Sequence, residues 1–369
     1  MKAVITGGGT GGHIYPALSV ADKLSEKDWE IEYVGNKDSL EEDIIDGTDY
    51  EFHSVKVLPL PRSLNLNLFK SIFISLKAVI TSYKLIKKIK PDVVFGTGGY
   101  VTGPVLLASY LNQIPTVIHE QNIYPGITNK LLAFFVNKIA VNNIEAAKYF
   151  AGKAKNKIIE TGNPIRSEII NTSKEEGIKK LGLKDEYKTL FIMGGSQGSE
   201  TINKAVVDAI DDVMNIDKLQ IILITGKNNY EDVINQLKDK TKKYEKRLMI
   251  IPYLNNIEWA YAAADLIIYR AGATGIAEIT GRGLPAILIP FPYSAEGHQE
   301  VNAKFMEENG AAVMVDDEKF DGDVLVKLVN EIFADEKRLS EMGKKSKKLS
   351  KLKASQNIVE IIENQVREE

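Results

Sequence analysis

The chain has 369 residues, of which 44% are hydrophobic and 26% charged, with a formal net charge of −3 and no cysteine. This length favours two domains, and the composition is typical of a globular protein. The lack of cysteine excludes disulfides and thiolate metal sites, and the negative net charge argues against a general nucleic-acid-binding protein.

The N-terminal residues predict a strand that leads directly into a glycine-rich turn. Lys2–Thr6 has the apolar character of a buried parallel strand, residues 7–13 read GGGTGGH, and a helix is expected from about Tyr15 to Lys27. Because no basic and apolar leader precedes this strand, we expect no signal peptide. No apolar run reaches the ~18 residues of a membrane span, so we expect a cytoplasmic chain whose membrane contact, if any, is peripheral.

The glycine-rich turn allows two interpretations. Gly7, Gly9 and Gly12 match the dinucleotide-binding pattern, with Glu32 ending the next strand about 20 residues on, which would make this an NAD-binding domain. The same turn would bind any phosphate, because a strand, a tight turn and a helix aim backbone N–H groups at an anion. His13 stands where the helix begins, in a turn that faces the carboxyl-end crevice of a parallel sheet. We therefore take His13 as a candidate functional residue.

A strongly amphipathic helix is expected from about Asn67. Packing against the protein core explains its main apolar stripe, which repeats at helical spacing through Phe69, Ile72, Phe73, Leu76, Ile80 and Tyr83. Further apolar residues near the helix start accompany a row of lysines, Lys70, Lys77, Lys84 and Lys88. This combination favours a helix that dips into an anionic membrane surface. The residues expected to make that contact are Leu66, Leu68, Phe69, Phe73, Lys70 and Lys77.

The rest of the first half alternates strands with helices, which predicts an α/β domain with a doubly wound parallel sheet. Two segments in this part follow strands and are rich in glycine or polar residues. Gly96–Pro104 is a second glycine-rich loop, and Glu120, Gln121 and Asn122 follow the strand expected at 116–119. The turn at Gly162–Pro164 breaks the pattern, and we place the domain boundary there.

The second half opens as the first does. A strand at Thr189–Met193 leads into GGSQGS at 194–199 and then into a helix. Later, a strand at Leu266–Tyr269 leads through small residues to a helix expected near Ile276, with Glu278 in its first turn. A polar loop at 292–299 leaves the next strand at the same end, where ligands bind in open α/β sheets. The alternative for Glu278 is that its charge only complements the helix dipole.

We expect no bound metal. Asp321 and Asp323 have the spacing of a carboxylate pair that some glycosyltransferases use for a divalent ion, but they precede a helix and are better explained as its N-cap. No pair of histidines has metal-ligand spacing either.

Four blocks in chain order resemble glycosyltransferases of the MurG type: GGGTGGHIYPA, then GTGGYVTGP with HEQN, then GNPIR with GGSQGS, and finally residues 265–303. The resemblance spans nearly the whole chain. It implies the GT-B architecture, in which two Rossmann-like parallel-sheet domains face each other across a cleft. The expected parts are an acceptor- and membrane-binding domain at 1–163, a UDP-sugar donor domain at 164–340, and a helical tail at 341–369 that packs back on the first domain.

The resemblance also implies an activity. Such an enzyme is an inverting hexosyltransferase that moves N-acetylglucosamine from UDP-N-acetylglucosamine to the C4 hydroxyl of lipid I, which is undecaprenyl-pyrophosphoryl-N-acetylmuramoyl-pentapeptide. The product is lipid II for peptidoglycan, made without a metal or other cofactor at the cytoplasmic face of the membrane. The alternatives are another GT-B transferase that uses a UDP-sugar and a lipid acceptor, and a nucleotide-binding module without catalysis.

Positions that match the family motifs imply the binding residues. In the first half, Thr10, Gly11 and Gly12 would lie near the transferred sugar and diphosphate, Asn122 would bind the sugar, and Arg166 would lie by the nucleotide phosphates.

In the second half, Ser196 would also lie by the phosphates, and the backbone of Leu254 would contact the uracil. Gln299 would bind sugar hydroxyls, and the adjacent His298 departs from the glutamine of some relatives. The helix start would carry the phosphates and ribose through Ala273, Thr274, Gly275, Ile276, Ala277 and Glu278.

Transfer with inversion needs a base for the attacking hydroxyl and stabilisation of the departing UDP. An unperturbed histidine has a pKa of about 6.5, so His13 is the first candidate for the base, and Glu120 is the second. Without a metal, backbone N–H groups at helix ends, together with Ser196 and Arg166, would stabilise the diphosphate.

Overall fold

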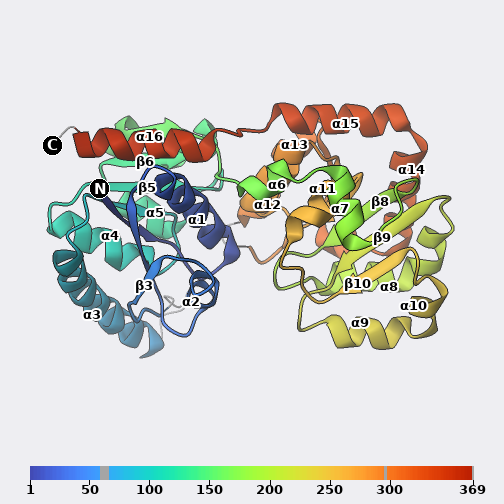
Figure 1. Cartoon of the computed structure of the whole chain (residues 1–369), viewed down its shortest axis with the longest axis horizontal. Helices are drawn as coiled ribbons and strands as arrows, with labels where there is room; N and C mark the ends of the chain where they lie inside the picture. Colours follow the sequence, from blue (N-terminus) through green and yellow to red (C-terminus); the bar gives the residue numbers. More distant parts are fainter. Residues whose placement is uncertain (59–65, 295–296, 368–369) are drawn as a thin grey trace. The chain divides into compact units, whose positions relative to one another are not determined.

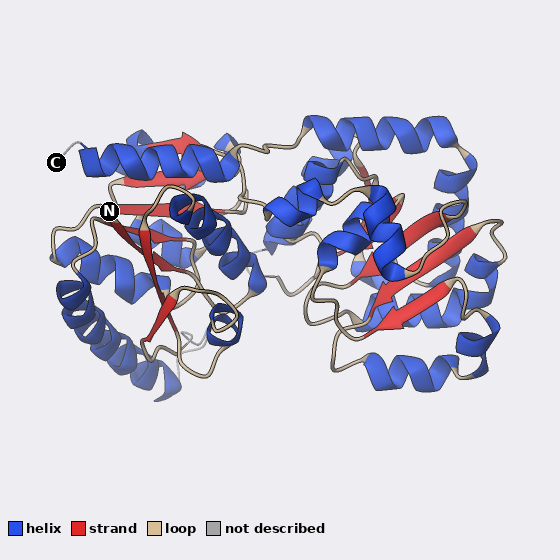
Figure 2. Ribbon diagram, in the orientation of Figure 1, coloured by secondary structure: helices blue, strands red, loops and turns tan. Residues whose placement is uncertain are grey.

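The computed structural model of the protein describes residues 1–58, 66–294 and 297–367, and for residues 66–72 it describes the helical backbone but not the side chains. The chain forms two compact units, Met1–Arg166 with Lys351–Glu369, and Ser167–Ser350 (Figures 1 and 2). Each unit is built on a parallel sheet with helices, so the predicted α/β class with two Rossmann-like domains is confirmed. No helix among the described residues is long and apolar enough to cross a bilayer.

The first unit contains a seven-stranded parallel sheet in the order β3-β2-β1-β4-β5-β6-β7. Its strands are β1 (Lys2–Thr6), β2 (Glu30–Gly35), β3 (Glu51–Ser54), β4 (Val93–Gly96), β5 (Thr116–Glu120), β6 (Lys138–Val141) and β7 (Ile158–Glu160). The central strands are almost continuously apolar because helices cover both faces of the sheet. The strand order reverses at β1, and ligand crevices form at the carboxyl ends of strands at such a switch point.

Two layers of helices enclose this sheet. On one face lie α1 (Gly11–Ser25) and α16 (Ala354–Arg367), whose buried residues pack with Ala3 and Ile5 of β1. On the other face, residues of α3 (Leu66–Ile89), α4 (Thr102–Leu111) and α5 (Ile127–Leu132) pack with Val4 and Val34. A short helix, α2 (Leu40–Ile45), follows β2, and two 3-10 segments, η1 (Ile144–Tyr149) and η2 (Gly152–Lys157), separate β6 from β7.

The prediction that the main apolar stripe of α3 packs on the core is wrong. Phe73, Leu76 and Ile80 are 58%, 60% and 58% exposed, whereas Ala78 and Ile86 are buried. The buried face also includes Ser82, and it packs against α4. Small residues let two helix backbones approach closely, so the face with alanine and serine is turned inward and the bulky stripe is left outside.

The second unit contains a six-stranded parallel sheet in the order β10-β9-β8-β11-β12-β13. Its strands are β8 (Lys188–Met193), β9 (Leu219–Ile224), β10 (Leu248–Ile251), β11 (Leu266–Tyr269), β12 (Ala286–Leu288) and β13 (Ala312–Met314). The strand order reverses at β8, as it does at β1 in the first unit. Each unit therefore places a glycine-rich loop, residues 7–12 or 194–198, at its own switch point.

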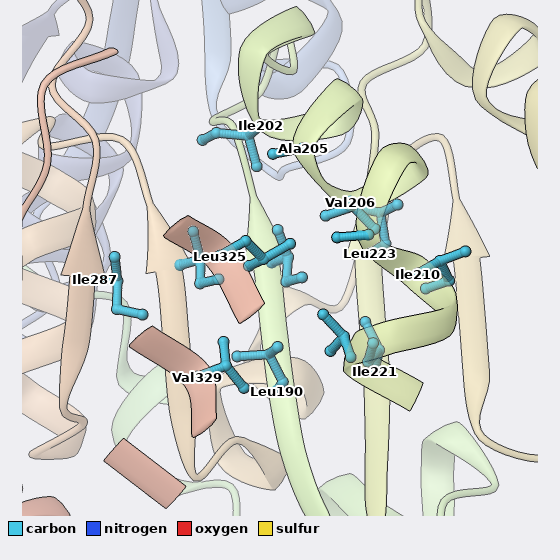
Figure 3. Close-up of a cluster of buried hydrophobic side chains, with 14 of the residues drawn as sticks. Leu190, Ile202, Ala205, Val206, Ile210, Ile221, Leu223, Ile287, Leu325 and Val329 are labelled. Carbon is cyan, nitrogen blue, oxygen red and sulfur yellow. The ribbon is translucent and has the colours of Figure 1, made fainter. Parts of the chain in front are cut away.

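Many short helices surround the second sheet. They are α6 (Ser167–Asn171), α7 (Lys174–Leu181), α8 (Glu200–Met214), α9 (Tyr230–Leu237), α10 (Asp239–Lys243), α11 (Ile257–Ala263), α12 (Ala273–Arg282), α13 (His298–Glu308), η4 (Asp317–Lys319), α14 (Gly322–Ala334) and α15 (Glu336–Lys348). Figure 3 shows the core between the sheet and two of them, where Leu190 and Leu223 of the sheet meet Val206 of α8 and Leu325 of α14. Asp321 caps α14 by accepting the Val324 N–H at 2.9 Å, which confirms the predicted N-cap.

The observed units differ slightly from the predicted parts. The first unit extends to Arg166, three residues beyond the predicted boundary, and the returning segment starts at Lys351 rather than at 341. Residues 341–348 belong to α15, which packs on α12, and the Lys347 ammonium donates to the Gly281 carbonyl. This packing is why α15 stays with the second unit.

The C-terminal helix α16 completes the core of the first unit. Ile358, Val359 and Ile362 are buried in one cluster with Leu24 of α1 and with Trp29. Their spacing places them on one face of the helix, so a segment more than 300 residues from β1 in the sequence helps to cover it.

We expect Ile362→Ala to lower the free energy of unfolding of the first unit by about 2–5 kcal/mol, because truncation of a fully buried side chain leaves a cavity. The measurement is denaturant unfolding followed by the fluorescence of Trp29 in a Trp259→Phe background. Glu360→Ala, on the exposed face of the same helix, is the control and should change stability by at most about 0.5 kcal/mol. An unchanged midpoint for Ile362→Ala would contradict this packing of α16.

Candidate functional site

Two glycine-rich loops meet at the carboxyl edge of the first sheet, after the neighbouring strands β1 and β4. The Gly8 N–H donates to the Gly98 carbonyl at 3.4 Å. A Cβ on Gly99 would lie 2.2 Å from the Gly8 carbonyl oxygen, and the φ of Gly99 is +86°. Only glycine allows both this approach and this backbone conformation.

Thr10, Gly11, Gly12 and His13 lie at the start of α1, which begins earlier than expected. Thr10 is the N-cap residue, although its side chain makes no capping hydrogen bond, and His13 is the third residue of the helix. The first N–H groups of a helix have no partner within it and point outward along its axis. In α1 the His13 N–H donates to the Thr10 carbonyl at 3.0 Å, and the helix start lies at the carboxyl edge of the sheet, after β1.

The His13 ring is held by Thr97, which directly follows β4. The Nδ1 atom of His13 lies 2.9 Å from the Thr97 carbonyl oxygen, and the Thr97 hydroxyl donates to the His13 carbonyl at 2.8 Å. A carbonyl can only accept, so in the neutral ring the proton is on Nδ1 and the lone pair on Nε2. In this tautomer His13 can accept a proton through Nε2.

Glu120 lies at the end of β5 and is 1% exposed. One carboxylate oxygen accepts the backbone and side-chain N–H groups of Asn122 at 2.9 and 3.2 Å, and the other accepts from Gly126 at 3.1 Å and Asn129 at 2.8 Å. Burial raises the pKa of Glu120 above its usual value, and these hydrogen bonds act in the opposite direction. The carboxylate thus fixes the loop that carries Asn122.

Two buried side chains that the sequence did not point to also hold the first glycine-rich loop. The Glu41 carboxylate is fully buried and accepts the N–H groups of Gly9 at 3.2 Å and Asn36 at 3.1 Å. The Tyr33 hydroxyl donates to the Gly7 carbonyl at 2.6 Å. Glu41 begins the acidic run EED at 41–43, a pattern that usually marks an exposed helix start, so no local signal distinguished it.

The interpretation of Glu32 as the acidic residue of a dinucleotide site is wrong. Glu32 is the third residue of β2 rather than its last, and its carboxylate contacts the Lys2 ammonium at 2.7 Å and His53 at 2.5 Å. Ligand atoms of Glu32, Glu51 and His53 lie within 4.8 Å of one another, and no second group of this kind occurs among the residues that the structure describes. The Lys2 ammonium already compensates the charge of Glu32 in this group.

In the second unit, Arg270 joins the loops that follow three strands. Its guanidinium donates to Ser199 Oγ at 2.5 Å and to the carbonyls of Ile289 and Pro290, both at 3.2 Å, and it forms an ion pair with Asp317. Ser199 is also the N-cap of α8. Arg270 therefore helps to hold the loop that contains the exposed Ser196.

The first turn of α12 begins at Ala273, three residues before the expected start. Glu278 consequently lies in the second turn and not in the first, so the simple dipole explanation is wrong. Glu278 is 5% exposed and lies beside Tyr261, where burial, assisted by the charge of Glu278, raises the tyrosine pKa well above its usual value. Ala273, Thr274 and Gly275 form the first turn of α12, and a Cβ on Gly275 would lie 2.3 Å from the Tyr269 ring, so Gly275 packs directly on that ring. Ile276 and Ala277 follow within the helix and are buried.

The other candidate residues are one in a loop, one at the start of a helix and one at the end of the main segment of the first unit. Leu254 lies in the loop after β10 and is half-buried. Gln299 is the second residue of α13, and its side-chain oxygen accepts the Phe291 N–H at 2.9 Å. Arg166 is the last residue of this part of the first unit, and its guanidinium lies over the Tyr15 ring, 4.3 Å from the centroid.

Both halves of the chain match models of one enzyme family. Residues 3–141 match the glycosyltransferase family 28 N-terminal domain, and residues 189–358 match the family 28 C-terminal domain. The chain is 50% identical over 367 residues to the UDP-N-acetylglucosamine--N-acetylmuramyl-(pentapeptide) pyrophosphoryl-undecaprenol N-acetylglucosamine transferase of Halothermothrix orenii. The matched residues cover 99% of each chain. The transferase of the same name from Thermoanaerobacter sp. (strain X514) is 41% identical over 367 residues, covering 99% of this chain and 100% of its own.

Solved structures agree with these relatives. The crystal structure of Acinetobacter baumannii MurG has a TM-score of 0.73 and 25% identity, with 98% of this chain and 99% of that chain covered. A co-structure of S. aureus MnaA with UDP has a TM-score of 0.72 at 17% identity, covering 100% of this chain and 97% of the other, a likeness of fold alone. With both units matched and a relative half identical along the whole chain, this protein belongs to glycosyltransferase family 28, among the transferases of the MurG type.

Proposed function

We propose that this chain is an inverting glycosyltransferase that moves N-acetylglucosamine from UDP-N-acetylglucosamine to the C4 hydroxyl of the N-acetylmuramoyl residue of lipid I. Lipid II is the product, and peptidoglycan synthesis is the process. The observation that carries the proposal is the 50% identity, over 99% of both chains, to the transferase of H. orenii.

In this proposal the second unit binds the UDP-sugar. Ser196 and the N–H groups of the first turn of α12 contact the diphosphate, where a helix N-terminus supplies about half a positive charge. Glu278 accepts hydrogen bonds from the ribose hydroxyls, the Leu254 backbone contacts the uracil, and Gln299 binds sugar hydroxyls. Arg166 adds a guanidinium to the diphosphate. Donors that are already in place stabilise the charge that develops on UDP as it leaves, which lets the reaction proceed without a metal.

His13 is the base in this proposal. With its Nδ1 proton donated to Thr97, its Nε2 accepts the proton of the C4 hydroxyl. The hydroxyl oxygen forms the new bond to C1 of the sugar while the C1–O bond to the diphosphate breaks, and UDP leaves with that electron pair. Glu120 is a poorer base because both its oxygens already accept hydrogen bonds and almost none of it is exposed. Its role is to hold Asn122 against the sugar.

The first unit carries an exposed apolar surface suited to a membrane-linked acceptor. This surface, the apolar patch, comes from α3, α4, α5 and the residues just after α5, and it comprises Phe73, Leu76, Ile80, Tyr110, Leu111, Ile127, Leu131, Phe134 and Phe135. The helices pack in series, α3 on α4 and α4 on α5, and the rings of Tyr110 and Phe135 are 5.5 Å apart. Exposed apolar surface of this extent marks an interaction site.

Lysines on α3 favour an anionic lipid surface as the partner of the patch. Lys77, Lys84, Lys87 and Lys88 are exposed on the helix that carries Phe73, and a basic residue near such a surface contributes about 1 kcal/mol. The side chains of Leu66, Leu68, Phe69 and Lys70, which the sequence also suggested, lie outside the described residues. We therefore infer peripheral binding to the cytoplasmic face of the membrane through the apolar patch.

The test of the function is transfer of labelled N-acetylglucosamine from its UDP derivative to a short-chain lipid I analogue with EDTA present. We expect the wild-type protein to form product and His13→Ala to turn over about 10²-fold more slowly or worse, since it lacks the base. His53→Ala, on β3, is the matched control and should retain the wild-type rate. Wild-type turnover in His13→Ala would remove that residue from the role. Glycosylation of diacylglycerol but not of the analogue would favour a different acceptor class.

Glu278→Gln keeps the size of the side chain and removes its charge. We expect the KM for UDP-N-acetylglucosamine to rise roughly tenfold or more, because hydrogen bonds to a charged acceptor contribute about 1.5–3 kcal/mol. The KM for the acceptor should not change. Glu300→Gln on the exposed side of α13 serves as the control. A donor KM equal to that of the wild type would contradict the contact with the ribose.

Leu76→Asp places a carboxylate in the centre of the apolar stripe on α3. We expect binding to vesicles of anionic phospholipid to fall by about tenfold or more. The variant lacks the Leu side chain whose burial in the lipid would be favourable, and the new carboxylate is repelled by the anionic lipid. Turnover with a water-soluble acceptor should be retained. Ile144→Asp, at a residue 51% exposed on η1 of the same unit, is the control. Equal vesicle binding by Leu76→Asp and Ile144→Asp would argue against the patch.

A further inference from the structure

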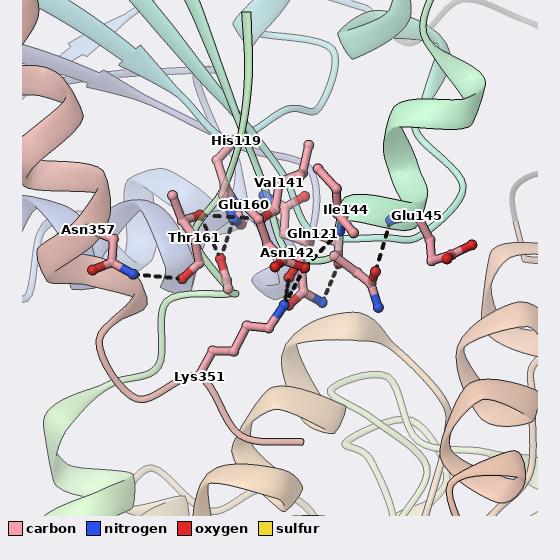
Figure 4. A network of polar contacts seen from close by, with 12 residues as sticks. His119, Gln121, Val141, Asn142, Ile144, Glu145, Glu160, Thr161, Lys351 and Asn357 are labelled. Atoms are coloured by element: carbon pink, nitrogen blue, oxygen red, sulfur yellow. Dashed lines mark hydrogen bonds and ion pairs between the residues drawn. The ribbon is translucent and has the colours of Figure 1, made fainter. Parts of the chain in front are cut away.

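A row of hydrogen bonds runs along the carboxyl edge of the first sheet and ends at His13. We call it the edge row, and it consists of His13, Thr97, Gln121, Asn142 and Lys351. Thr97, Gln121 and Asn142 directly follow β4, β5 and β6, which are neighbours in the sheet. Figure 4 shows the part of the row formed by Gln121, Asn142 and Lys351.

At one end of the edge row, a single carbonyl accepts two side chains. The Thr97 oxygen lies 2.9 Å from His13 Nδ1 and 2.7 Å from Gln121 Nε2. A carbonyl oxygen has two lone pairs, so these two donors occupy both of them. Thr97 and Gln121 are 0% and 2% exposed, so bulk water does not reach the hydrogen bond between the Gln121 amide and the Thr97 carbonyl.

At the other end, the row is anchored to the returning C-terminal segment. Asn142 Nδ2 donates to the Gln121 carbonyl at 2.9 Å, and the Asn142 N–H donates to the Glu120 carbonyl at 2.9 Å. The Lys351 ammonium donates to the Asn142 carbonyl at 2.9 Å and pairs with the Glu160 carboxylate at 2.6 Å. Lys351 thus holds the Asn142 backbone, and the Asn142 side chain holds the Gln121 backbone. The Gln121 side chain in turn holds the Thr97 carbonyl.

The row has a chemical consequence for the His13 ring. The tautomer of a neutral histidine is set by the hydrogen bond that one ring nitrogen makes. Because Thr97 offers an acceptor to Nδ1, the ring must carry its proton there and leave the lone pair on Nε2. This holds only while the Thr97 carbonyl points at the ring, and Gln121 is the side chain that holds the carbonyl from its other side.

We propose that Gln121 and Asn142 are positioning residues for the transfer reaction, which hold His13 through the Thr97 carbonyl in the tautomer and orientation that a base requires. The proposal rests on the role of His13 in the proposed function. Gln121 acts directly on the carbonyl, and Asn142 acts by holding Gln121.

The test combines ¹⁵N NMR of the histidine rings with steady-state kinetics of the full chain. Selective labelling gives signals from only four histidines, and the His13→Ala variant identifies that of His13. At about pH 8, where an ordinary histidine is neutral, the wild-type signal of His13 should be that of the Nδ1–H tautomer. His119 is an internal reference of the opposite kind, since its Nε2 donates to the Gly162 carbonyl at 2.9 Å and burial lowers its pKa to about 4.

Gln121→Met keeps the length of the side chain and removes the donor. We expect a mixture of His13 tautomers and an unchanged donor KM. The kcat should fall roughly tenfold, because the variant would lose part of the 10²–10⁴-fold that a general base contributes. Asn142→Ala, which leaves Gln121 in place, should shift both readouts in the same direction but less. Asn357→Ala is the matched control, because its amide donates to the Thr161 carbonyl at 3.3 Å beside the row but outside it.

The outcomes separate the two proposals. If Gln121→Met changes neither the His13 tautomer nor kcat, or changes only one of them, the positioning role is wrong, whatever His13→Ala does in the transfer assay. If His13→Ala turns over normally, the proposed base is wrong even where the tautomer responds to Gln121. Thermal unfolding and binding of UDP to the second unit verify that each variant is folded.

Discussion

The carboxyl edge of the first sheet depends on one close contact, in which the backbone at Gly8 meets the backbone at Gly98 and Gly99. A Cβ on Gly99 would overlap the Gly8 carbonyl oxygen at 2.2 Å, so any side chain there would push apart the loops that follow β1 and β4. His13 follows one of these loops and Thr97 begins the other. The 2.9 Å contact between His13 Nδ1 and the Thr97 oxygen therefore requires the loops to meet as they do.

The second unit reaches a comparable arrangement with a buried charged side chain instead of bare backbone. Arg270, 8% exposed, joins the loops after β8 and β12 and pairs with Asp317. Burying a guanidinium costs free energy, which the ion pair and three further hydrogen bonds offset. The loop with Ser196 is thereby shaped before any ligand arrives, and such preorganisation is what stabilisation of a departing diphosphate needs.

Buried carboxylates have a related role in the first unit. Glu41 and Glu120 accept backbone N–H groups from the loops beside His13 and Asn122. Glu41 thereby holds the loop that precedes His13, and Glu120 holds the loop that carries Asn122. This separates the residues proposed to meet the substrate from those that hold them, and it explains why a carboxylate near the site need not be the base.

Local patterns were enough to predict the strands, the glycine-rich loops and the α/β class, because runs of apolar residues and glycines act within a few positions of the chain. Local patterns did not predict which face of α3 points inward. That face depends on packing against α4, which buries the small residues Ala78 and Ser82 and leaves the larger apolar stripe exposed. The start of α12 and the position of Glu32 within β2 were also misjudged, because element boundaries depend on neighbouring strands. The substrate contacts inferred from family motifs stay predictions.

The sequence by itself determined which segments are strands, where the glycine-rich turns fall and which family the motifs resemble. Only the tertiary structure decided that Thr97, Gln121 and Asn142 form one row ending at His13, and that Arg270 and Glu41 hold the loops. The reason is physical. The contacts of Thr97 with His13 and Gln121, of Asn142 with Gln121, of Glu41 with Gly9 and of Arg270 with Ser199 join residues that are from 21 to 84 positions apart. The side-by-side order of the parallel strands brings such residues together.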